Sequence, residues 1–206
     1  MALMIRVGLY GSYWGDTPDT SHALSYEQEQ LNATYIWQSL GRRGWTKNAV
    51  AAMLGNMQSE SSINPGRWEG NVVGGDPYQH GYGLVQWTPY TKYTEWAPQN
   101  GYSDYSEMDA NLARIEYEVA NEIQWIATSA YPMTFAEFKA SEDSPYNLAM
   151  AFLANYERPA DPDQPQRGEQ AQAWFEYLGG ITPTKKKEHH FKFVFTQGRR
   201  RRILNG

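Results

Sequence analysis

The sequence predicts a mainly helical α+β domain that carries a small β-hairpin beside one of its helices. Several segments repeat apolar residues at the spacing of a helix face, and Ser or Thr residues precede them as caps. A glycine-rich segment follows one of these helices, as is typical of a hairpin or an irregular sheet. We expect the domain to span residues 25–180, between an N-terminal arm (1–24) and a basic C-terminal tail (181–206).

The first expected helix begins at a capping box. Ser25-Tyr-Glu-Gln28 has the spacing at which the serine and glutamine side chains accept hydrogen bonds from each other's backbone N–H groups. The helix then runs to about Leu40, where Gly41 and Gly44 end it. Residues 1–24 show no period and are expected to form an irregular arm or a short strand.

The second expected helix carries a carboxylate on its buried side. Thr46 is the cap that starts it, and Asn64-Pro-Gly66 is the signal that ends it. Its apolar residues have the spacing of a buried stripe: Val50, Met53, Leu54 and Met57. Glu60 stands three residues further along the same stripe, so its side chain is expected to face the core near the helix C-terminus.

The glycine-rich segment 63–80 is expected to pair with Tyr82–Trp87 in the small β-hairpin. It also carries two acidic residues, Glu69 and Asp76.

Two helices are expected after the hairpin. Thr88 and Pro89 have the order of a cap and a first helical residue, which predicts a helix through Trp96. Ser106–Ile126 is the longest amphipathic segment, and its glutamates are expected to form a solvated face. Its apolar stripe consists of Leu112, Ile115, Val119, Ile123 and Ile126.

The last helices have clear boundaries. Thr134-Phe-Ala-Glu137 is a second capping box, and it starts a short helix. Ser144 caps the next helix, Pro145–Tyr156, which has proline at its first position. The final helix, about Pro165–Leu178, ends at Gly179-Gly180.

The composition excludes several kinds of site. The chain has no cysteine, so disulfides, thiol catalysis and thiolate metal ligands are excluded. Its four histidines show no metal-ligand spacing, so we expect no metal and no cofactor. No apolar run has the length of a transmembrane segment, and the first residues do not have the pattern of a secretory signal peptide.

Charge is unevenly distributed along the chain. The whole chain has a net charge of −5, but residues 181–206 carry +7, which leaves −12 for residues 1–180. This asymmetry suggests that the basic tail contacts a partner, and a disordered basic end is the alternative. The run Arg199–Arg202 has no aromatic context typical of nucleic-acid binding, so we do not expect nucleic acid as the partner.

Glu60 is the candidate for acid chemistry. Burial disfavours the charged form of a carboxyl, and so does the negative end of a helix dipole. Both effects favour the protonated form of such a carboxyl, and a general acid that works near neutral pH requires a raised pKa. The alternative is structural: Glu60 then caps the helix end or forms a salt bridge.

Separate motifs follow one another along the chain. The first is Met53–Glu60 with Asn64-Pro-Gly66, and the second is Gly81-Tyr-Gly-Leu-Val-Gln-Trp-Thr-Pro89. The third is Asn155-Tyr-Glu-Arg-Pro159 with Gln164-Pro-Gln-Arg-Gly168. From about residue 31 to residue 180 the chain therefore resembles the phage tail lysozymes, which are peptidoglycan-cutting domains on the tail tips of bacteriophages.

The resemblance implies a lysozyme-like fold, mainly helical with the small β-hairpin beside the catalytic helix. It implies a glycoside hydrolase (muramidase) that cuts the glycan strand when the phage enters its host, with Glu60 as the general acid. A second group must activate water or stabilise the oxocarbenium ion. The candidates are Asp76, ranked narrowly first, and Glu69; the alternative for both is an exposed loop carboxylate.

Other residues are expected to hold the sugars. The resemblance implies that Gln86 lines the sugar cleft, and its alternative role is to tie the hairpin to the helix. Tyr82 and Trp87 are candidate sugar platforms, together with Trp68 and Tyr90. Packing in the core is the alternative for all these rings.

The motif that contains Tyr156 and Glu157 is implied to lie near the catalytic helix. In that place it would help to orient Glu60 and to bind the substrate. A buried structural network of Glu157 with Arg158 is the alternative.

Two further functions are compatible with the same residues. A lytic transglycosylase would use the same glutamate, with the muramyl 6-hydroxyl in place of water. A structural tail-tip or wall-docking protein would keep the fold without turnover. The implied partners are the peptidoglycan glycan strand and other phage tail proteins, the latter through the basic tail (181–206), and the implied location is the tail tip of the virion.

Overall fold

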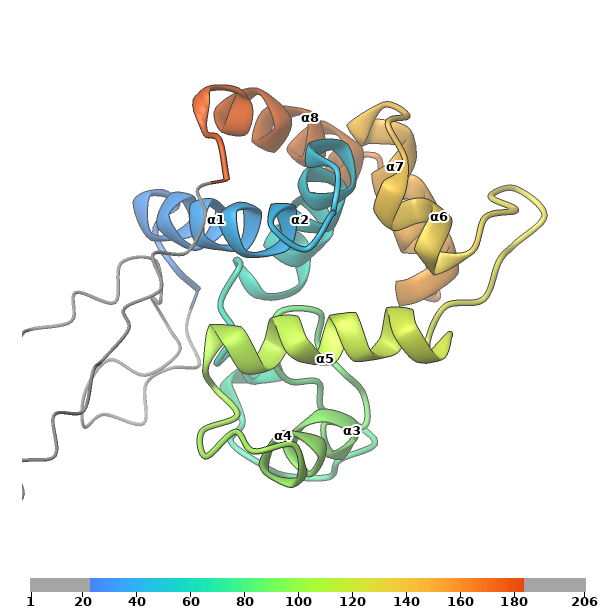
Figure 1. Ribbon diagram of the computed structural model, residues 1–206. Coiled ribbons are helices and arrows are strands. Elements are labelled where there is room, and N and C mark those ends of the chain that lie inside the picture. Colours follow the sequence, from blue (N-terminus) through green and yellow to red (C-terminus); the bar gives the residue numbers. More distant parts are fainter. Residues whose placement is uncertain (1–22, 184–206) are drawn as a thin grey trace, which may run out of the picture.

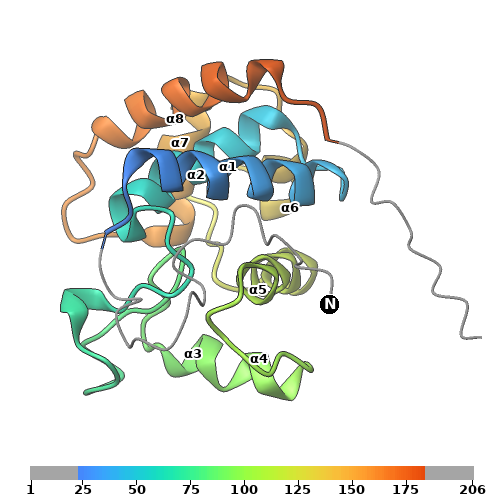
Figure 2. The same cartoon turned by 90° about the vertical axis from the view of Figure 1, so that its left-hand side faces the viewer.

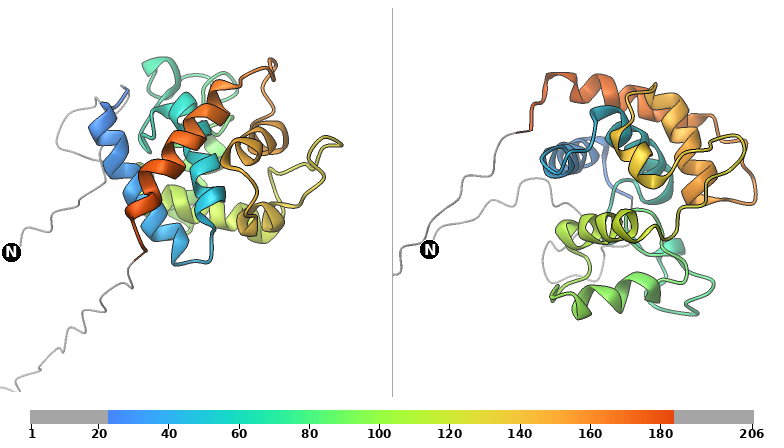
Figure 3. Two further views of the ribbon diagram at one scale, coloured as in Figure 1. Left: turned by 90° about the horizontal axis from the view of Figure 1, so that it is seen from above. Right: turned by 45° about the vertical axis from the view of Figure 1, so that its right-hand side comes forward.

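Helix α2 (Lys47–Ser61) is the element around which the others are arranged. The computed structural model describes residues 23–183. In it α1 (Tyr26–Gly41), α7 (Pro145–Phe152) and α8 (Gln166–Tyr177) pack against α2. The view from above in Figure 3 shows α8 lying across α2.

A second layer lies below this group of helices. Helix α5 (Met108–Asn121) crosses the molecule under α1 and α2, and the short helices α3 (Thr91–Thr94) and α4 (Trp96–Gln99) lie on its far side (Figure 1). Figure 2 shows the same order from the side, with α5 seen along its axis. The chain between α2 and α3 connects the two layers.

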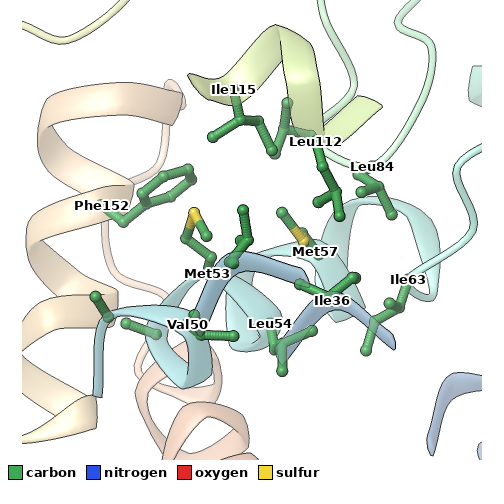
Figure 4. Close-up of a cluster of buried hydrophobic side chains, with 14 of the residues drawn as sticks. Ile36, Val50, Met53, Leu54, Met57, Ile63, Leu84, Leu112, Ile115 and Phe152 are labelled. Atoms are coloured by element: carbon green, nitrogen blue, oxygen red, sulfur yellow. The ribbon is translucent and has the colours of Figure 1, made fainter. Parts of the chain in front are cut away.

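The hydrophobic core sits between α2 and α5. Met53 and Met57 of α2 point toward Leu112 and Ile115 of α5, and Phe152 of α7 closes one side (Figure 4). All five side chains are fully buried. Burial of one such side chain contributes about 1.5–3 kcal/mol, so this cluster is a main source of the attraction between the layers.

The helix starts that were predicted from the caps Ser25 and Thr46 are confirmed. Oγ of Ser25 accepts a hydrogen bond from the Gln28 N–H, and the Gln28 side chain accepts one from the Ser25 N–H. Thr46 caps α2 through a 3.1 Å bond from the Ala49 N–H. Helix α2 ends at Ser61, and the next residue has the left-handed conformation (φ 56°).

The predicted β-hairpin is wrong. Within residues 23–183 no strand forms, and Tyr82 makes only isolated bridges with Trp68 and Trp87. The backbone turns at Gly83 (φ 85°) and again at Gln86 (φ 48°). An extended strand needs negative φ at successive residues, so these two positions end any pairing after one residue.

Two helices of the second layer are shorter than predicted. Thr88 and Pro89 do not start a helix: α3 begins at Thr91 and ends at Thr94, and the separate helix α4 begins at Trp96. Helix α5 ends at Asn121, so Ile123 and Ile126 are not on its apolar stripe and are exposed. Beyond α5 the Ile126 N–H donates a hydrogen bond to the Asn155 carbonyl. The chain after α5 therefore lies next to the residues that follow α7.

The last helices follow the predicted caps. The second capping box starts α6 (Phe135–Ala140), and Ser144 caps α7. The helix predicted through Tyr156 changes at Leu153 into a π-helical turn, η2 (Leu153–Glu157). Helix α8 is followed by a single 3₁₀ turn, η3 (Leu178–Gly180).

The ends of the chain lie largely outside the described residues. The predicted N-terminal arm (1–24) is described only at residues 23 and 24, and the predicted basic tail (181–206) only at residues 181–183. Ile181 accepts a hydrogen bond from the Trp37 indole N–H, so the chain beyond α8 returns to α1. No helix in the described part of the chain is long and apolar enough to cross a membrane.

Glycines allow α2 and α8 to approach closely. A Cβ on Gly55 would lie 2.3 Å from the Arg167 carbonyl oxygen and 2.7 Å from the Ala171 N. Gly168 allows a similar close approach between α8 and α7, because a Cβ there would lie 2.4 Å from the ring of Tyr146 on α7. Any side chain at Gly55 would therefore push α8 away from α2.

We expect Gly55→Ala to lower the free energy of unfolding by about 1–3 kcal/mol, because the added methyl group overlaps the backbone of α8. Denaturant unfolding measures the change. Gly179→Ala is the matched control, since its Cβ would come no closer than 3.9 Å to Lys47 Nζ. Equal stability of the Gly55 variant and the wild type would contradict the close packing described above.

Candidate active site

Glu60 lies at the C-terminal end of α2, at the boundary between core and solvent. Its side chain is 21% exposed. Arg167 in the first turn of α8 pairs with it, with Nη2 lying 2.7 Å from Oε1 of Glu60. The arginine side chain is only 6% exposed, so water and salt screen this ion pair less than one on the surface.

Other contacts fix the direction of the Arg167 side chain. Its Nε donates to Oε1 of Gln164 at 2.6 Å, and its Nη1 donates to Oδ1 of Asn56 at 3.3 Å. Asn56 is fully buried on α2 and donates to the Ala149 carbonyl of α7 at 3.1 Å. The planar guanidinium is therefore held by α2 and by the turn before α8 while it faces Glu60.

A cavity of about 340 Å³ lies beside Glu60. Glu69 and Glu157 line it together with Glu60, so carboxylates from three segments of the chain meet there. The lining also includes amides and aromatic rings: Gln86, Trp87, Gln124 and Tyr156. Amides that can donate and accept, next to aromatic faces, suit a polar ligand such as a sugar.

Glu157 is a half-buried residue of the cavity with one enclosed carboxyl oxygen. Its Oε1 is inaccessible and accepts no hydrogen bond from any residue among 23–183. Burial raises the pKa of Glu157 well above its usual range, and the negative charge of Glu60 raises it further. Arg167 and Arg158 oppose the shift only in part.

A buried network supports the wall of the cavity from α5. Oε1 of Glu118 accepts hydrogen bonds from the Trp87 indole N–H at 3.0 Å and from Nε of Arg114 at 2.9 Å. The Tyr156 hydroxyl donates to its Oε2. Burial raises the pKa of Glu118, and these bonds to its charged form oppose the rise. The network fixes the two aromatic rings that line the cavity.

Asn111 on α5 anchors the chain that precedes Trp87. Its Oδ1 accepts the Leu84 N–H at 3.0 Å, and its Nδ2 donates to the Tyr93 hydroxyl at 2.9 Å. A Cβ on Gly83 would lie 2.7 Å from Oδ1 of Asn111, and Gly83 also has a φ of 85°. Glycine is therefore required there both by the turn and by the contact.

Gln86 lies on the cavity wall and bonds to the turn that carries it, so it does not tie a hairpin to the helix. It lines the cavity, but its Nε2 donates to the carbonyl oxygens of Arg67 at 3.1 Å and Gly83 at 2.8 Å. The amide nitrogen is therefore engaged in closing the turn. Its Oε1 is the group that is left to face a ligand.

Comparison with known proteins identifies the family. The family model described as phage tail lysozyme matches residues 31–178. The chain belongs to the phage tail lysozyme family. Morphogenesis protein 1 of Bacillus phage B103 is 53% identical over 157 residues, which are 76% of this chain and 42% of that protein. The chain thus spans less than half the length of this relative.

The two candidates for the second acid of this phage tail lysozyme domain lie in different surroundings. Glu69 lines the cavity, and its Oε2 accepts the Gly81 N–H at 2.7 Å. Asp76 is exposed and is not one of the described residues that line the cavity. Its oxygens accept bonds from the Tyr78 N–H and the Gln79 side chain, both on its own loop.

Most of the candidate sugar platforms are core residues. Tyr82 is 1% exposed, with its ring 4.5 Å from that of Trp68 and stacked on Tyr93. Trp87 is also buried and lines the cavity. Tyr90 packs edge-on against Trp68 and is half-buried. Of these rings, Trp87 is the one that contributes to the cavity of the phage tail lysozyme domain.

Several site residues were not singled out from the sequence. Arg167 stands inside a recognised motif, but nothing local indicates that it reaches Glu60. Glu118 was counted with the solvated glutamates of α5, yet it is 1% exposed. Its place three residues after Ile115, on the apolar stripe, was the available signal. Within residues 23–183 no group of three His, Asp or Glu side chains is arranged to hold a metal ion.

We expect Arg167→Lys to lower the free energy of unfolding by about 1–3 kcal/mol, because an ammonium cannot reach Glu60, Asn56 and Gln164 at once and leaves a buried partner unsatisfied. Thermal or denaturant unfolding measures the effect. Arg43→Lys, which alters an exposed arginine, is the control and should stay close to the wild type. Similar small changes in the free energy of unfolding of both variants would show that the contacts of the buried Arg167 guanidinium are not important for stability.

Proposed function

We propose that this domain is a peptidoglycan hydrolase of a phage particle, most specifically a muramidase, with Glu60 as its general acid. The observation that carries the proposal is Glu60 itself: it stands at the end of α2, next to Arg167, on a cavity of about 340 Å³. Membership of the phage tail lysozyme family supplies the substrate class. Fold likeness alone would not support it; the glutamate in its motif does.

Hydrolysis of a glycosidic bond requires two side chains of the protein that act on the sugar. Glu60 in its protonated form donates to the glycosidic oxygen, and the bond to the anomeric carbon breaks with oxocarbenium character. A second carboxylate takes a proton from the attacking water or stabilises the cation. Glu69 is the better supported candidate because it lines the cavity with Glu60, and Asp76 is the other. Gln86 and the ring of Trp87 are proposed to hold the sugars.

The name of the relative favours a second function. Morphogenesis protein 1 of Bacillus phage B103 is named for particle assembly and not for catalysis. A structural tail-tip protein that docks on the cell wall would explain such a name. A lytic transglycosylase is the third candidate, since it uses the same glutamate but directs the muramyl 6-hydroxyl to the anomeric carbon in place of water.

We propose the virion as the location, with the tail tip as the site of action. The family and the phage relative support a place in the particle. Other tail proteins are the proposed partners, through the basic residues 181–206. Opposite charge on a neighbouring subunit would attract this tail.

Digestion of purified Gram-positive cell walls tests the proposal. The wild type should release fragments with normal reducing ends, which mass spectrometry identifies, and Glu60→Gln should lose at least about 100-fold of the rate, because general acid catalysis contributes about 10²–10⁴-fold. Glu142→Gln removes the same charge at an exposed position and is the control. Fragments with 1,6-anhydro ends would assign a transglycosylase, and wall binding without release by either protein would assign a structural role.

A further inference from the structure

Glu157 is a cavity carboxyl without a cation of its own. Oε1 of Glu157 is buried and accepts no hydrogen bond from the described residues. The guanidinium of Arg158 is bound to the backbone instead, since its Nη1 donates to the carbonyl oxygens of Gln124 at 2.5 Å and Asn155 at 2.6 Å. The sequence also allowed a buried structural network of Glu157 with Arg158. The contacts of Arg158 include no hydrogen bond between the two side chains.

Among the described residues, Arg167 is the only cation that forms an ion pair with a carboxylate of the cavity, and this carboxylate is Glu60. The Nε and Nη1 of Arg167 donate to Gln164 and Asn56. If Glu60 and Glu157 were both ionised, two negative charges would share one positive charge in a partly dry cavity. Two carboxyls in this situation keep one proton between them, because the second ionisation must separate like charges.

We propose that Glu60 and Glu157 hold a single proton between them, and that Glu157 is a positioning residue that keeps this proton in the cavity for Glu60. This rests on the proposed function for its last step, the donation to the glycosidic oxygen. Glu157 gives its proton to Glu60, and Glu60 gives it to the leaving oxygen. Solvent returns one proton to the pair after the attacking water has lost its own to the second carboxylate.

Charged groups from every neighbouring element act on Glu157. Glu60 of α2 and Glu118 of α5 favour its neutral form, and Arg167 of α8 and its neighbour Arg158 favour its charged form. Glu69 also lines the cavity. Burial is the largest influence, and the net result is a pKa well above the usual range of a glutamate.

Carbon-13 NMR of the glutamate carboxyls in the full chain tests the shared proton without any need for activity. In the wild type, the Glu157 resonance should titrate well above pH 4.5, and it should be absent in Glu157→Gln. In Glu60→Gln it should titrate lower by about one pH unit or more, because the neighbouring charge is gone. Glu29, whose pKa burial raises to about 7, is the internal reference on α1. An unchanged Glu157 midpoint in Glu60→Gln would overturn the proposal.

The pH profile of wall digestion supplies the functional readout. Loss of activity at high pH should begin about one pH unit lower or more in Glu157→Gln, since Glu60 then loses its proton without a partner carboxyl. Glu142→Gln should keep the wild-type profile. A wild-type profile in Glu157→Gln overturns this inference and leaves the proposed function intact. Full activity in Glu60→Gln overturns the proposed function, whatever the titration shows. If Glu157→Gln is inactive at every pH, the NMR titration decides.

Discussion

The ion pair of Glu60 with Arg167 depends on how closely α2 and α8 approach each other. Gly55 leaves room for the backbone of α8, and Asn56, the next residue, binds the guanidinium that this approach brings in. Because Arg167 is almost completely buried, it could not be accommodated without these partners. The same short stretch of α2 therefore provides the helix contact, the support for the arginine and the acid itself.

The wall of the cavity that contains Trp87 and Tyr156 is supported by α5 and has a different basis. Glu118 and Asn111 are buried polar side chains whose hydrogen bonds hold Trp87 and the turn at Gly83. Buried polar groups are costly unless they are satisfied, and both are satisfied here by several partners. The chain that connects the layers is irregular in the described structure, and these hydrogen bonds fix its side chains in place of the bonds of a sheet.

Local signals in the sequence predicted most of the helices. The caps at Ser25, Thr46 and Thr134 act within one turn, so they could be recognised from neighbouring residues alone. The stripe that ends at Glu60 was recognisable for the same reason. Two predictions that were wrong concern segments whose partners are distant in the sequence. The segment predicted as a hairpin forms turns that bond to Asn111. The segment after Asn121, predicted as part of the α5 helix, leaves the helix and bonds to Asn155 through the Ile126 N–H. Arg167, the ion-pair partner of Glu60, comes from more than 90 residues further along the chain, so no local pattern indicated that it would reach Glu60.

The most direct measurement is a crystal structure of Glu60→Gln bound to a tetrasaccharide fragment of the peptidoglycan glycan strand. We expect the glycosidic oxygen to lie within hydrogen-bond distance of the residue 60 side chain, with sugar rings in the cavity next to Trp87 and Glu157. Removal of the acid should leave the binding geometry intact, because Arg167 still donates to Asn56 and Gln164 and can donate to the amide oxygen of the new side chain. A fragment bound on another face, with residue 60 out of reach of any glycosidic oxygen, would contradict the role of Glu60 as the proton donor.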